Sequence, residues 1–568
     1  MHKSIIELLD GSASTDGIIQ FEQPTRSTIK FADIWSRSAR LAARLKDLVG
    51  SSKSVCGILR AEENAIGTLL ACWLAGLDFA SLPDRARGMS QIEHDRQIKE
   101  IIKLLGCSVM FVRSPDEAID ITEISKITYR DIYESTSERH PLASGGEVGR
   151  LIQFTSGSTS LPKGIAIGMD QIGFNVRSMA EAFGFNSSDT SASWLPLSHD
   201  MGLIGTVMLP IASMSKDLGG IERMWLLSPE GFIKDPLHWL KVDSGKSSSF
   251  TMVPNFALDL MTRKLAMASH LDLTPFRHMI ISAETVKSSS LARFARACAQ
   301  FGFDELAYQP AYGMAEVTLG ASTVASDEMW SSLCVNRSAF SDGKVIITDS
   351  SIASQPRHLD KSSEYLIDNE EIVCLGKPFP GFAIEIDSEQ EDQIGNVLIK
   401  SGSIAQEMFG QEMRLDNNGF LKTDDLGFIR DGELYFAGRS DDWIVVAGSN
   451  LDARAIEQMA SNHEAVRAGN CVAVIDELGT YALVAEPSDE LAASISGQQS
   501  SSSGYVLDQI ANEITRLIGP LSGISPSRII FVERGKLPKT PSGKLQRRKV
   551  SLGLDRLEAK IHEYWVKN

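Results

Sequence analysis

The segment Ser54-Val55-Cys56-Gly57-Ile58-Leu59 is a short apolar run, and its length and composition predict a buried strand. The neighbouring segments continue this pattern in both directions. Helices are expected over Phe31–Leu48, Asn64–Ala75 and Ile92–Leu105, and further strands over Phe79–Leu82 and Cys107–Phe111. Strands that alternate with helices predict an α/β fold with a mainly parallel sheet covered on both faces.

A loop rich in glycine and hydroxyl groups follows the next apolar run, Leu151–Phe154. Residues Phe154 to Gly164 read Phe-Thr-Ser-Gly-Ser-Thr-Ser-Leu-Pro-Lys-Gly. Gly157 lets the backbone approach a ligand closely, and Lys163 adds a positive charge. No Gly-Lys-Ser/Thr closes the loop, so a P-loop NTPase is disfavoured. We expect phosphate oxygens to be bound by exposed amides and by the hydroxyls of Ser156, Ser158 and Thr159.

Length and composition limit the classes of protein to consider. The chain of 568 residues predicts two or more domains, and a net charge of -17 argues against nucleic-acid partners and anionic membrane surfaces. The longest apolar run, Ala65–Leu77, is too short to span a bilayer, so no membrane insertion is expected. Seven scattered cysteines without a Cys-x-x-Cys pair favour thiols in a reducing, cytoplasmic setting.

The chain changes character near the turn-rich, acidic segment Tyr435–Ile444. Beyond it, strands are expected over Cys471–Ile475, Tyr481–Ala485 and Arg528–Val532, with a helix over Val506–Leu517 and a Ser/Gln-rich loop over Gly497–Gly504. We therefore place a large N-terminal domain at residues 1–438 and a small C-terminal domain at 439–568.

Three later motifs carry groups suited to binding a nucleotide. In Tyr312-Gly313-Met314-Ala315-Glu316, the ring is able to stack on a purine while the carboxylate holds a magnesium ion. Thr423–Gly427 places a carboxylate where ribose hydroxyls are able to donate to it. Pro538–Lys544 is a rigid loop that presents a lysine. Taken singly, each motif is more often an ordinary solvent-facing loop.

The order of these motifs resembles the adenylate-forming superfamily of acyl-CoA synthetases, peptide-synthetase adenylation domains and luciferases. The matching stretches are Thr155–Gly164, Tyr312–Glu316, Thr423–Gly427, Gly438–Asp442 and Pro538–Lys544. The resemblance implies a large N-terminal domain of mixed and parallel sheets covered by helices, and a small mobile α+β C-terminal domain. The usual glycine before the ribose carboxylate is replaced here by Asp424.

Three further stretches look like the fatty acyl-AMP ligase branch: Trp194–Gly205, Ser228–Phe232 and Pro254–Ala257. The segment Val335–Lys344 is similar to the extra segment of these ligases. In the family that segment restrains the C-terminal domain and disfavours acyl release to free CoA. The resemblance implies ATP- and Mg²⁺-dependent activation of a fatty or related acid to an acyl adenylate, then transfer to the phosphopantetheine thiol of an acyl carrier protein.

The resemblance also assigns roles to single residues. Lys544 contacts the carboxylate and the α-phosphate, Glu316 holds magnesium, His199 lies between the acyl tunnel and the thiol entrance, and Asp441 is the hinge. The nucleotide site then comprises Thr155, Ser156, Gly157, Ser158, Thr159 and Lys163 at the phosphates, Ala283, Glu284, Tyr312, Gly313 and Met314 at the adenine, and Asp425 and Arg439 at the ribose.

Other functions stay open from the sequence. A CoA ligase has the same adenylation residues and differs in the thiol that it uses. An amino-acid adenylating enzyme needs an acid near the substrate amine, for which Asp259 and Asp200 are candidates. A non-catalytic nucleotide-binding scaffold is disfavoured by the intact ligand set. The tail Arg534–Lys549 carries seven basic residues and no acid, and two interpretations stay open: it steers carrier docking, or it only solvates a surface strand and loop.

Overall fold

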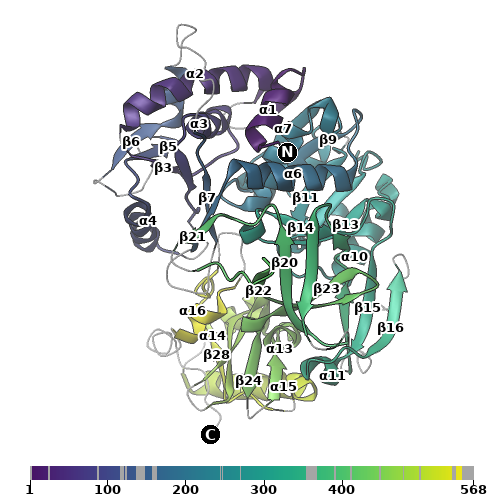
Figure 1. The fold of residues 1–568 in the computed structure, drawn as a ribbon. Helices are drawn as coiled ribbons and strands as arrows, with labels where there is room; N and C mark the ends of the chain where they lie inside the picture. The colour runs from purple at the N-terminus through teal and green to yellow at the C-terminus, as the bar shows by residue number, and fades with distance from the viewer. Residues whose placement is uncertain are drawn as a thin grey trace.

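The computed structural model describes most of the chain. The described residues are 3–22, 26–50, 52–85, 89–114, 121, 124–135, 147–155, 163–243, 245, 247–268, 270–352, 368–388, 390, 392–409, 412–446, 449–476, 479–497, 500–522, 524–539 and 545–552. No helix among them is long and apolar enough to cross a membrane. Figure 1 shows a large body above a smaller lobe formed by the end of the chain.

The predicted parallel sheet forms the N-terminal half of the body. Its strand order is β21-β8-β7-β4-β3-β5-β6, and β3 to β7 pair in parallel. The strands are β3 (Ser54–Gly57), β4 (Asp78–Ser81), β5 (Val109–Val112), β6 (Ser125–Thr128), β7 (Leu151–Thr155), β8 (Lys163–Ile167) and β21 (Glu407–Phe409). Helix α2 (Phe31–Val49) precedes β3 in the chain, and α3 (Glu63–Leu74), α4 (Gln91–Leu105) and α5 (Tyr129–Glu134) lie between the strands that follow.

A second, nine-stranded sheet shares the main hydrophobic core with the first. Its order is β18-β14-β13-β12-β11-β9-β10-β1-β2, with a parallel centre and antiparallel edges. Its strands are β1 (Ile18–Phe21), β2 (Ser27–Lys30), β9 (Thr190–Ser193), β10 (Arg223–Leu226), β11 (Phe250–Pro254), β12 (His278–Ser282), β13 (Tyr308–Gly313), β14 (Gly320–Thr323) and β18 (Lys377–Pro378). Its helices are α1 (Ile5–Ala13), α6 (Met169–Phe183), α7 (Leu209–Ala212), α8 (Pro229–Lys234), α9 (Asn255–Leu265) and α10 (Ser288–Cys298).

Two smaller antiparallel sheets complete the body. One has the order β16-β15-β17, and the other has the order β19-β20-β22-β23. Their elements are β15 (Ser331–Asn336), α11 (Arg337–Ser341), β16 (Ile347–Ile352), β17 (Asn369–Val373), β19 (Phe382–Asp387), β20 (Gly395–Ser401), β22 (Leu421–Arg430) and β23 (Glu433–Arg439).

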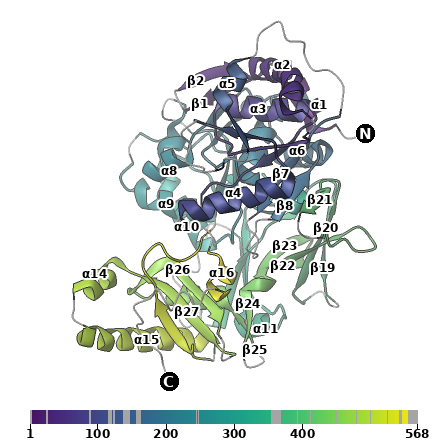
Figure 2. The same ribbon diagram turned by 90° about the vertical axis from the view of Figure 1, so that its left-hand side faces the viewer.

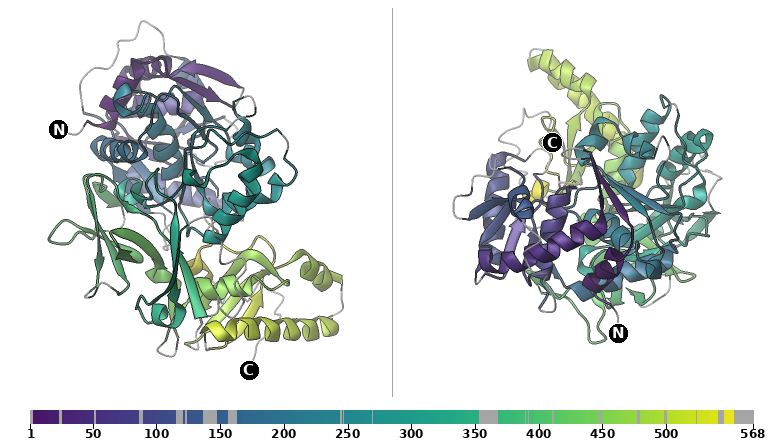
Figure 3. Two further views of the ribbon diagram at one scale, coloured as in Figure 1. Left: turned by 90° about the vertical axis from the view of Figure 1, so that its right-hand side faces the viewer. Right: turned by 90° about the horizontal axis from the view of Figure 1, so that it is seen from above.

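The C-terminal lobe has hydrophobic clusters of its own, made of residues between Ile444 and Val550. Figure 2 and the left view of Figure 3 show it as a separate yellow-green unit below the body. Its elements are η7 (Ser440–Asp442), β24 (Trp443–Val446), β25 (Ser449–Asp452), α13 (Ala453–Ala460), β26 (Val466–Ile475), β27 (Tyr481–Pro487), α14 (Asp489–Gly497), α15 (Ser500–Ser522), β28 (Arg528–Phe531) and α16 (Arg547–Leu552). The predicted fold class is confirmed, whereas α15 begins six residues earlier than the expected Val506, inside the expected loop.

Candidate active site

A large cleft of about 2430 Å³ lies where the body meets the C-terminal lobe. Elements from both lobes line it, so neither lobe forms it alone. Many of the residues selected from the sequence gather on its wall, although they are far apart in the chain. They are Lys163, His199, Ala283, Glu284, Tyr312, Gly313, Met314, Glu316, Asp425 and Arg439.

His199 stands on a tight loop between β9 and a π-helix, η1 (Met201–Met208). A Cβ at Gly202 would lie 2.1 Å from the Pro196 carbonyl oxygen, so this loop requires glycine there. The His199 Nδ1 is 2.5 Å from the Asp200 Oδ1. Burial favours the neutral ring, but the Asp200 carboxylate outweighs that effect and raises the pKa of His199. The cleft wall therefore carries a histidine that is more easily protonated than usual.

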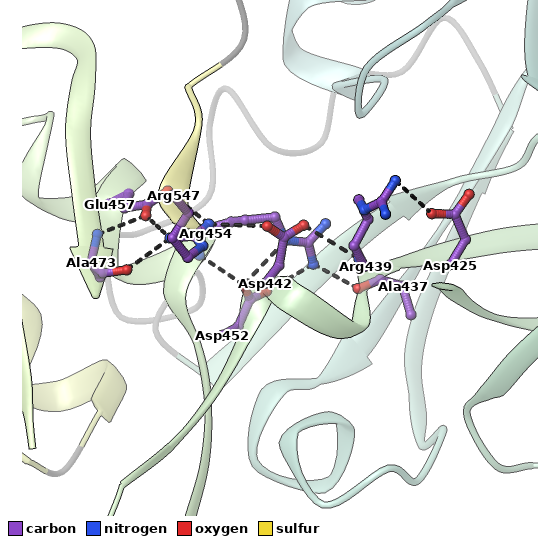
Figure 4. Close-up of polar contacts among 9 residues, drawn as sticks. All are labelled: Asp425, Ala437, Arg439, Asp442, Asp452, Arg454, Glu457, Ala473 and Arg547. Carbon is purple, nitrogen blue, oxygen red and sulfur yellow. Dashed lines mark hydrogen bonds and ion pairs between the residues drawn. The ribbon is translucent and has the colours of Figure 1, made fainter. Parts of the chain in front are cut away.

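Tyr312, Asp425 and Arg439 form one contact row across three strands. Tyr312 ends the buried part of β13, and its hydroxyl donates to the Asp425 Oδ2 at 2.8 Å. Burial and this carboxylate raise the pKa of Tyr312, so the phenol stays protonated and donates. The Asp425 Oδ1 lies 3.7 Å from the Arg439 Nη1 on the paired strand β23, as Figure 4 shows. The predicted purine and ribose residues are therefore in direct contact.

Glu316 follows this row on a short turn of helix, where it lines the cleft. Burial raises the pKa of Glu316, and the nearby Asp425 adds to the rise, while Lys163 and Arg439 oppose it. Within the described ranges, no group of three or more His, Cys, Asp or Glu side chains gathers to hold a metal ion. One carboxylate fits Mg²⁺, which is commonly bound by one or two carboxylates together with substrate phosphates.

The Ala283–Glu284 pair follows β12 at the cleft wall. Ala283 has a φ of 68°, a left-handed conformation that is uncommon outside glycine and clusters at functional sites. A Glu284 oxygen accepts a hydrogen bond from the backbone N–H of Phe256, at 2.5 Å. This contact joins the proposed adenine wall to the start of α9.

Several predicted residues lie outside the described part of the chain. These are Ser156, Gly157, Ser158, Thr159 and Lys544, together with the side chains of Thr155 and Asp441. The ends of their segments are nevertheless described. Strand β7 ends at Thr155 and β8 begins at Lys163 on the cleft wall, and Leu545 and Gln546 line the same cleft.

The family described as AMP-binding enzyme matches residues 15–349, which is more than half of the chain. The chain belongs to the AMP-binding enzyme family. The superfamily predicted from the order of the motifs is thereby confirmed.

Individual relatives of this AMP-binding enzyme are distant. JamA of Moorena producens (strain JHB), a medium-chain-fatty-acid–[acyl-carrier-protein] ligase, is 27% identical over 70% of this chain and 66% of its own length. FadD25 of Mycobacterium tuberculosis (strain ATCC 25618 / H37Rv), a putative fatty-acid–CoA ligase, is 25% identical over 95% of this chain and 93% of its own. A structure from studies of fatty acyl-adenylate ligases from E. coli and L. pneumophila has a TM-score of 0.81 at 23% identity, covering 98% of both chains. This likeness shows that the fold is shared.

In this AMP-binding enzyme, ion pairs that the motifs did not reveal hold the segment between the lobes. Asp442 accepts a hydrogen bond from the Arg439 backbone N–H at 3.3 Å, and its Oδ1 lies 3.0 Å from the Arg547 Nη2. Figure 4 shows Asp442 in the middle of a row of charged side chains that runs from Asp425 to Glu457. The sequence prediction named Asp441 as the hinge, and the two consecutive acids were the only signal pointing to Asp442.

Arg454, on α13, ties the C-terminal lobe of the AMP-binding enzyme to the body. Its Nη2 donates to the Ala437 carbonyl oxygen at 2.6 Å and to the Asp452 Oδ2 at 3.0 Å. Gly438 has a φ of 128°, and a Cβ there would lie 2.6 Å from the guanidinium carbon of Arg454. Glycine is therefore needed for Arg454 to reach across the end of β23.

Arg547, one of the basic residues of the tail, is not freely exposed. Its side chain is only 17% exposed, donates to the Ala473 carbonyl oxygen at 2.9 Å and pairs with Glu457 and Asp442. Burial raises the pKa of Glu457 to about 7, although Arg547 opposes that rise. Two other tail residues also have partners inside the lobe: Arg534 pairs with Asp489, and Lys539 donates to Asn470. These three basic residues of the tail are therefore already paired within the lobe, which the sequence alone does not show.

The segment Val335–Lys344 reaches the C-terminal lobe. It ends β15 and forms α11, and the Phe340 ring centroid is 6.0 Å from that of Trp443 on β24. The Arg337 Nη1 lies 3.2 Å from the Glu370 Oε2, which anchors α11 to β17. In this AMP-binding enzyme, Val335–Lys344 thus contacts both the body, at β17, and the C-terminal lobe, at β24.

Asp424, the departure beside the ribose carboxylate, is neutralised locally. Its Oδ1 accepts from the Arg414 Nη1 at 2.7 Å, and its Oδ2 lies 4.0 Å from the Arg439 Nη2. Asp424 and Arg414 both line the cleft of the AMP-binding enzyme, so the extra negative charge is balanced by arginines within the cleft wall.

Proposed function

We propose that the protein uses ATP to activate a fatty or related carboxylic acid as an acyl adenylate, with release of pyrophosphate. It then transfers the acyl group to the phosphopantetheine thiol of an acyl carrier protein. The observation that carries this proposal is the inter-lobe cleft, which gathers Glu316, Tyr312, Asp425, Arg439 and His199 in a chain of the AMP-binding enzyme family.

The first half-reaction needs charge neutralisation more than proton transfer. A fatty carboxylate is already ionised near neutral pH, so its attack on the α-phosphate requires no general base. Two anions must be aligned with pyrophosphate as the leaving group, and cations and backbone amides supply the necessary field. In this proposal Lys163 and Lys544 provide cations, and Asp425 with Arg439 orients the ribose.

Magnesium fits the site as a bridge between Glu316 and the nucleotide phosphates, where it supplies charge neutralisation. Glu316 is half-buried and is repelled by the Asp425 carboxylate, so a cation at Glu316 offsets this unfavourable electrostatic interaction. Tyr312 and Ala283–Glu284 would border the adenine.

The cleft offers an apolar wall for a fatty chain. The rings of Trp194 and Phe232 stack with centroids 3.6 Å apart, and the Phe256 centroid is 6.4 Å from that of Trp194. Met252 and Phe379 extend the lining. Hydrocarbon tails bind such walls because both surfaces leave water. His199 would lie where the apolar wall meets the entrance for the thiol.

The amino-acid alternative is weakened by the partners of its two candidate acids. Asp259 pairs with the Arg293 Nη2 at 2.8 Å, and Asp200 pairs with His199. A substrate amine would have to break one of these pairs. The CoA-ligase alternative shares the adenylation residues, and the name of the relative FadD25 keeps it as the second candidate.

We also propose that residues 1–438 and 439–568 act as two domains that turn about the Ser440–Asp442 segment between the half-reactions. Separate hydrophobic clusters in the C-terminal lobe support this division. No disulfide joins any of the seven cysteines, all of which are described and buried, and this supports our proposal of a reducing cytoplasmic setting.

The function is tested by pyrophosphate release across a panel of acids, followed by measurement of the thioester formed with CoA or with a holo-carrier protein. We expect fatty acids to give the fastest release and the carrier protein to be the preferred thiol. Preferred loading of CoA would identify a CoA ligase, and turnover of amino acids alone would overturn the proposal.

Glu316→Gln should lower the rate of acyl-adenylate formation by about 10- to 100-fold, because it removes a carboxylate ligand while keeping the shape of the side chain. The loss should shrink when Mg²⁺ is raised, which a titration of pyrophosphate release against Mg²⁺ measures. Glu328→Gln is the matched control, because Glu328 is outside the cleft lining. An unchanged Mg²⁺ dependence would remove Glu316 from the metal site.

Deletion of Val335–Lys344 should increase acyl transfer to CoA severalfold, because it removes the Phe340–Trp443 contact between the lobes. Phe340→Ala is a milder variant that keeps β15 and should change the ratio of CoA to carrier products in the same direction. Product ratios are read by mass spectrometry. A wild-type protein that loads CoA as fast as the carrier would contradict this prediction.

A further inference from the structure

Helix α4 carries a cationic stripe on the face that is turned away from the core. Ile92, Arg96, Lys99 and Lys103 are four, three and four residues apart, which places them on one side of a helix. All four side chains are exposed, and Ile92 is 82% exposed. The opposite side packs inward through His94, Ile98, Ile101, Ile102 and Leu105.

Apart from the electrostatic interaction of Arg96 with Glu93, the described residues show no internal partner for the cations of this stripe. In the part of the chain that the structure describes, no carboxylate lies within ion-pair distance of Arg96, Lys99 or Lys103. The acid of the first turn is used locally, since the Glu93 carboxylate accepts from the backbone N–H of Ser90 at 3.0 Å in a capping box. The stripe is therefore a local concentration of positive charge in a chain of net charge -17.

The stripe begins at the mouth of the cleft. Asp84 and Arg85, which follow β4 and precede α4, line the cleft. Lys549, on α16 of the C-terminal lobe, also lines it and interacts electrostatically with Glu93 in the first turn of α4. Figure 2 shows α4 lying across the front of the body directly above α16. A partner on α4 would therefore lie beside the junction of the two lobes.

We infer that the exposed face of α4, defined by Ile92, Arg96, Lys99 and Lys103, docks an acidic carrier domain that presents its phosphopantetheine thiol to the cleft. This inference rests on the proposed function. The cations complement an acidic partner and speed its encounter, and Ile92 provides an apolar contact. We assign carrier docking to this face rather than to the tail Arg534–Lys549. In that tail, Arg534, Lys539 and Arg547 already have partners inside the lobe.

The stripe suits a small acidic protein better than a nucleic acid. Only three cations lie along it, and the overall charge of -17 repels an extended polyanion. Each helix of a small carrier domain is able to present a few acids at matching spacing, so three charges and one apolar side chain are sufficient for a transient contact.

The test is the variant Arg96→Glu/Lys99→Glu/Lys103→Glu, assayed as the complete chain. We expect the KM for the holo-carrier protein to rise about tenfold or more, and the salt dependence of loading to be lost or reversed. Pyrophosphate release without a carrier, and acyl transfer to free pantetheine, should stay near wild type. The matched control is Lys46→Glu/Lys216→Glu/Lys241→Glu, which changes the net charge equally at exposed positions outside the cleft lining.

A milder triple variant to glutamine should raise the KM in the same direction by a smaller factor, and it guards against misfolding of the charge-reversed helix. Unchanged carrier KM in both stripe variants, or an equal effect in the control, would overturn the inference. Concentration-dependent self-association that the stripe variants abolish, with unchanged carrier KM, would assign the face to a second copy and also overturn it. Failure of the wild type to load any carrier would instead refute the proposed function.

Discussion

Lys544→Ala is expected to lower acyl-adenylate formation by about two to three orders of magnitude, with ATP affinity nearly unchanged. The lysine charge is needed mainly as the carboxylate and the α-phosphate approach each other, so its loss raises the barrier more than it weakens binding. The variant should still transfer an adenylate supplied ready-made, if the second half-reaction uses another face of the lobe.

The surroundings of Lys544 support this expectation. Lys539 and Leu545, which lie on either side of it in the chain, are joined by an antiparallel bridge. Lys539, Leu545 and Gln546 line the cleft. Single-turnover formation of acyl-AMP measures the prediction, and Lys536→Ala, an exposed lysine before the loop, is the control. A near wild-type rate in Lys544→Ala would show that the assigned role is wrong.

Arg547→Met is expected to lower the free energy of unfolding of the C-terminal lobe by about 3 kcal/mol, because it leaves two buried carboxylates without their cation. Glu457 and Asp442 both contact this guanidinium, and Glu457 also accepts from the Ala473 N–H at 2.7 Å. Chemical denaturation followed by far-UV circular dichroism and by tryptophan fluorescence, to which Trp443 contributes, measures the loss. The Arg547→Met/Glu457→Gln double variant should recover part of it.

The size of this loss should depend on pH. Glu457 already has a pKa of about 7, above the value of an unfolded chain, so its burial costs stability as pH rises past the unfolded value. Without Arg547 the folded pKa rises further. The difference between variant and wild type should therefore be larger at pH 8.5 than at pH 6. A pH-independent difference would mean that Glu457 is not the group left uncompensated.

Much of the fold was predictable because its signals are local. The strand at Ser54 and the helix ending at Leu105 were predicted nearly to the residue, since apolar periodicity reports which face is buried. The start of α15 was missed because Ser500–Gly504 carries no apolar period, although the backbone there is helical. The spacing of the α4 stripe is enough to place its side chains on one face of a helix. The sequence does not show that α16 lies next to this helix, because α16 is more than 400 residues further along the chain.

The sequence by itself determined the kinds of chemical group in the site and their order, because phosphate, purine and ribose binding demand particular residue types in particular loops. Only the tertiary structure decided which charged groups are paired with one another and which are free to bind a ligand or partner. From the sequence, Arg547 is one cation of a basic tail. In the structure it pairs with Glu457, which lies 90 residues earlier in the chain. Tyr312 and Asp425, 113 residues apart, likewise proved to be hydrogen-bond partners. Pairing depends on distance and burial, and neither is encoded in any local stretch of the chain.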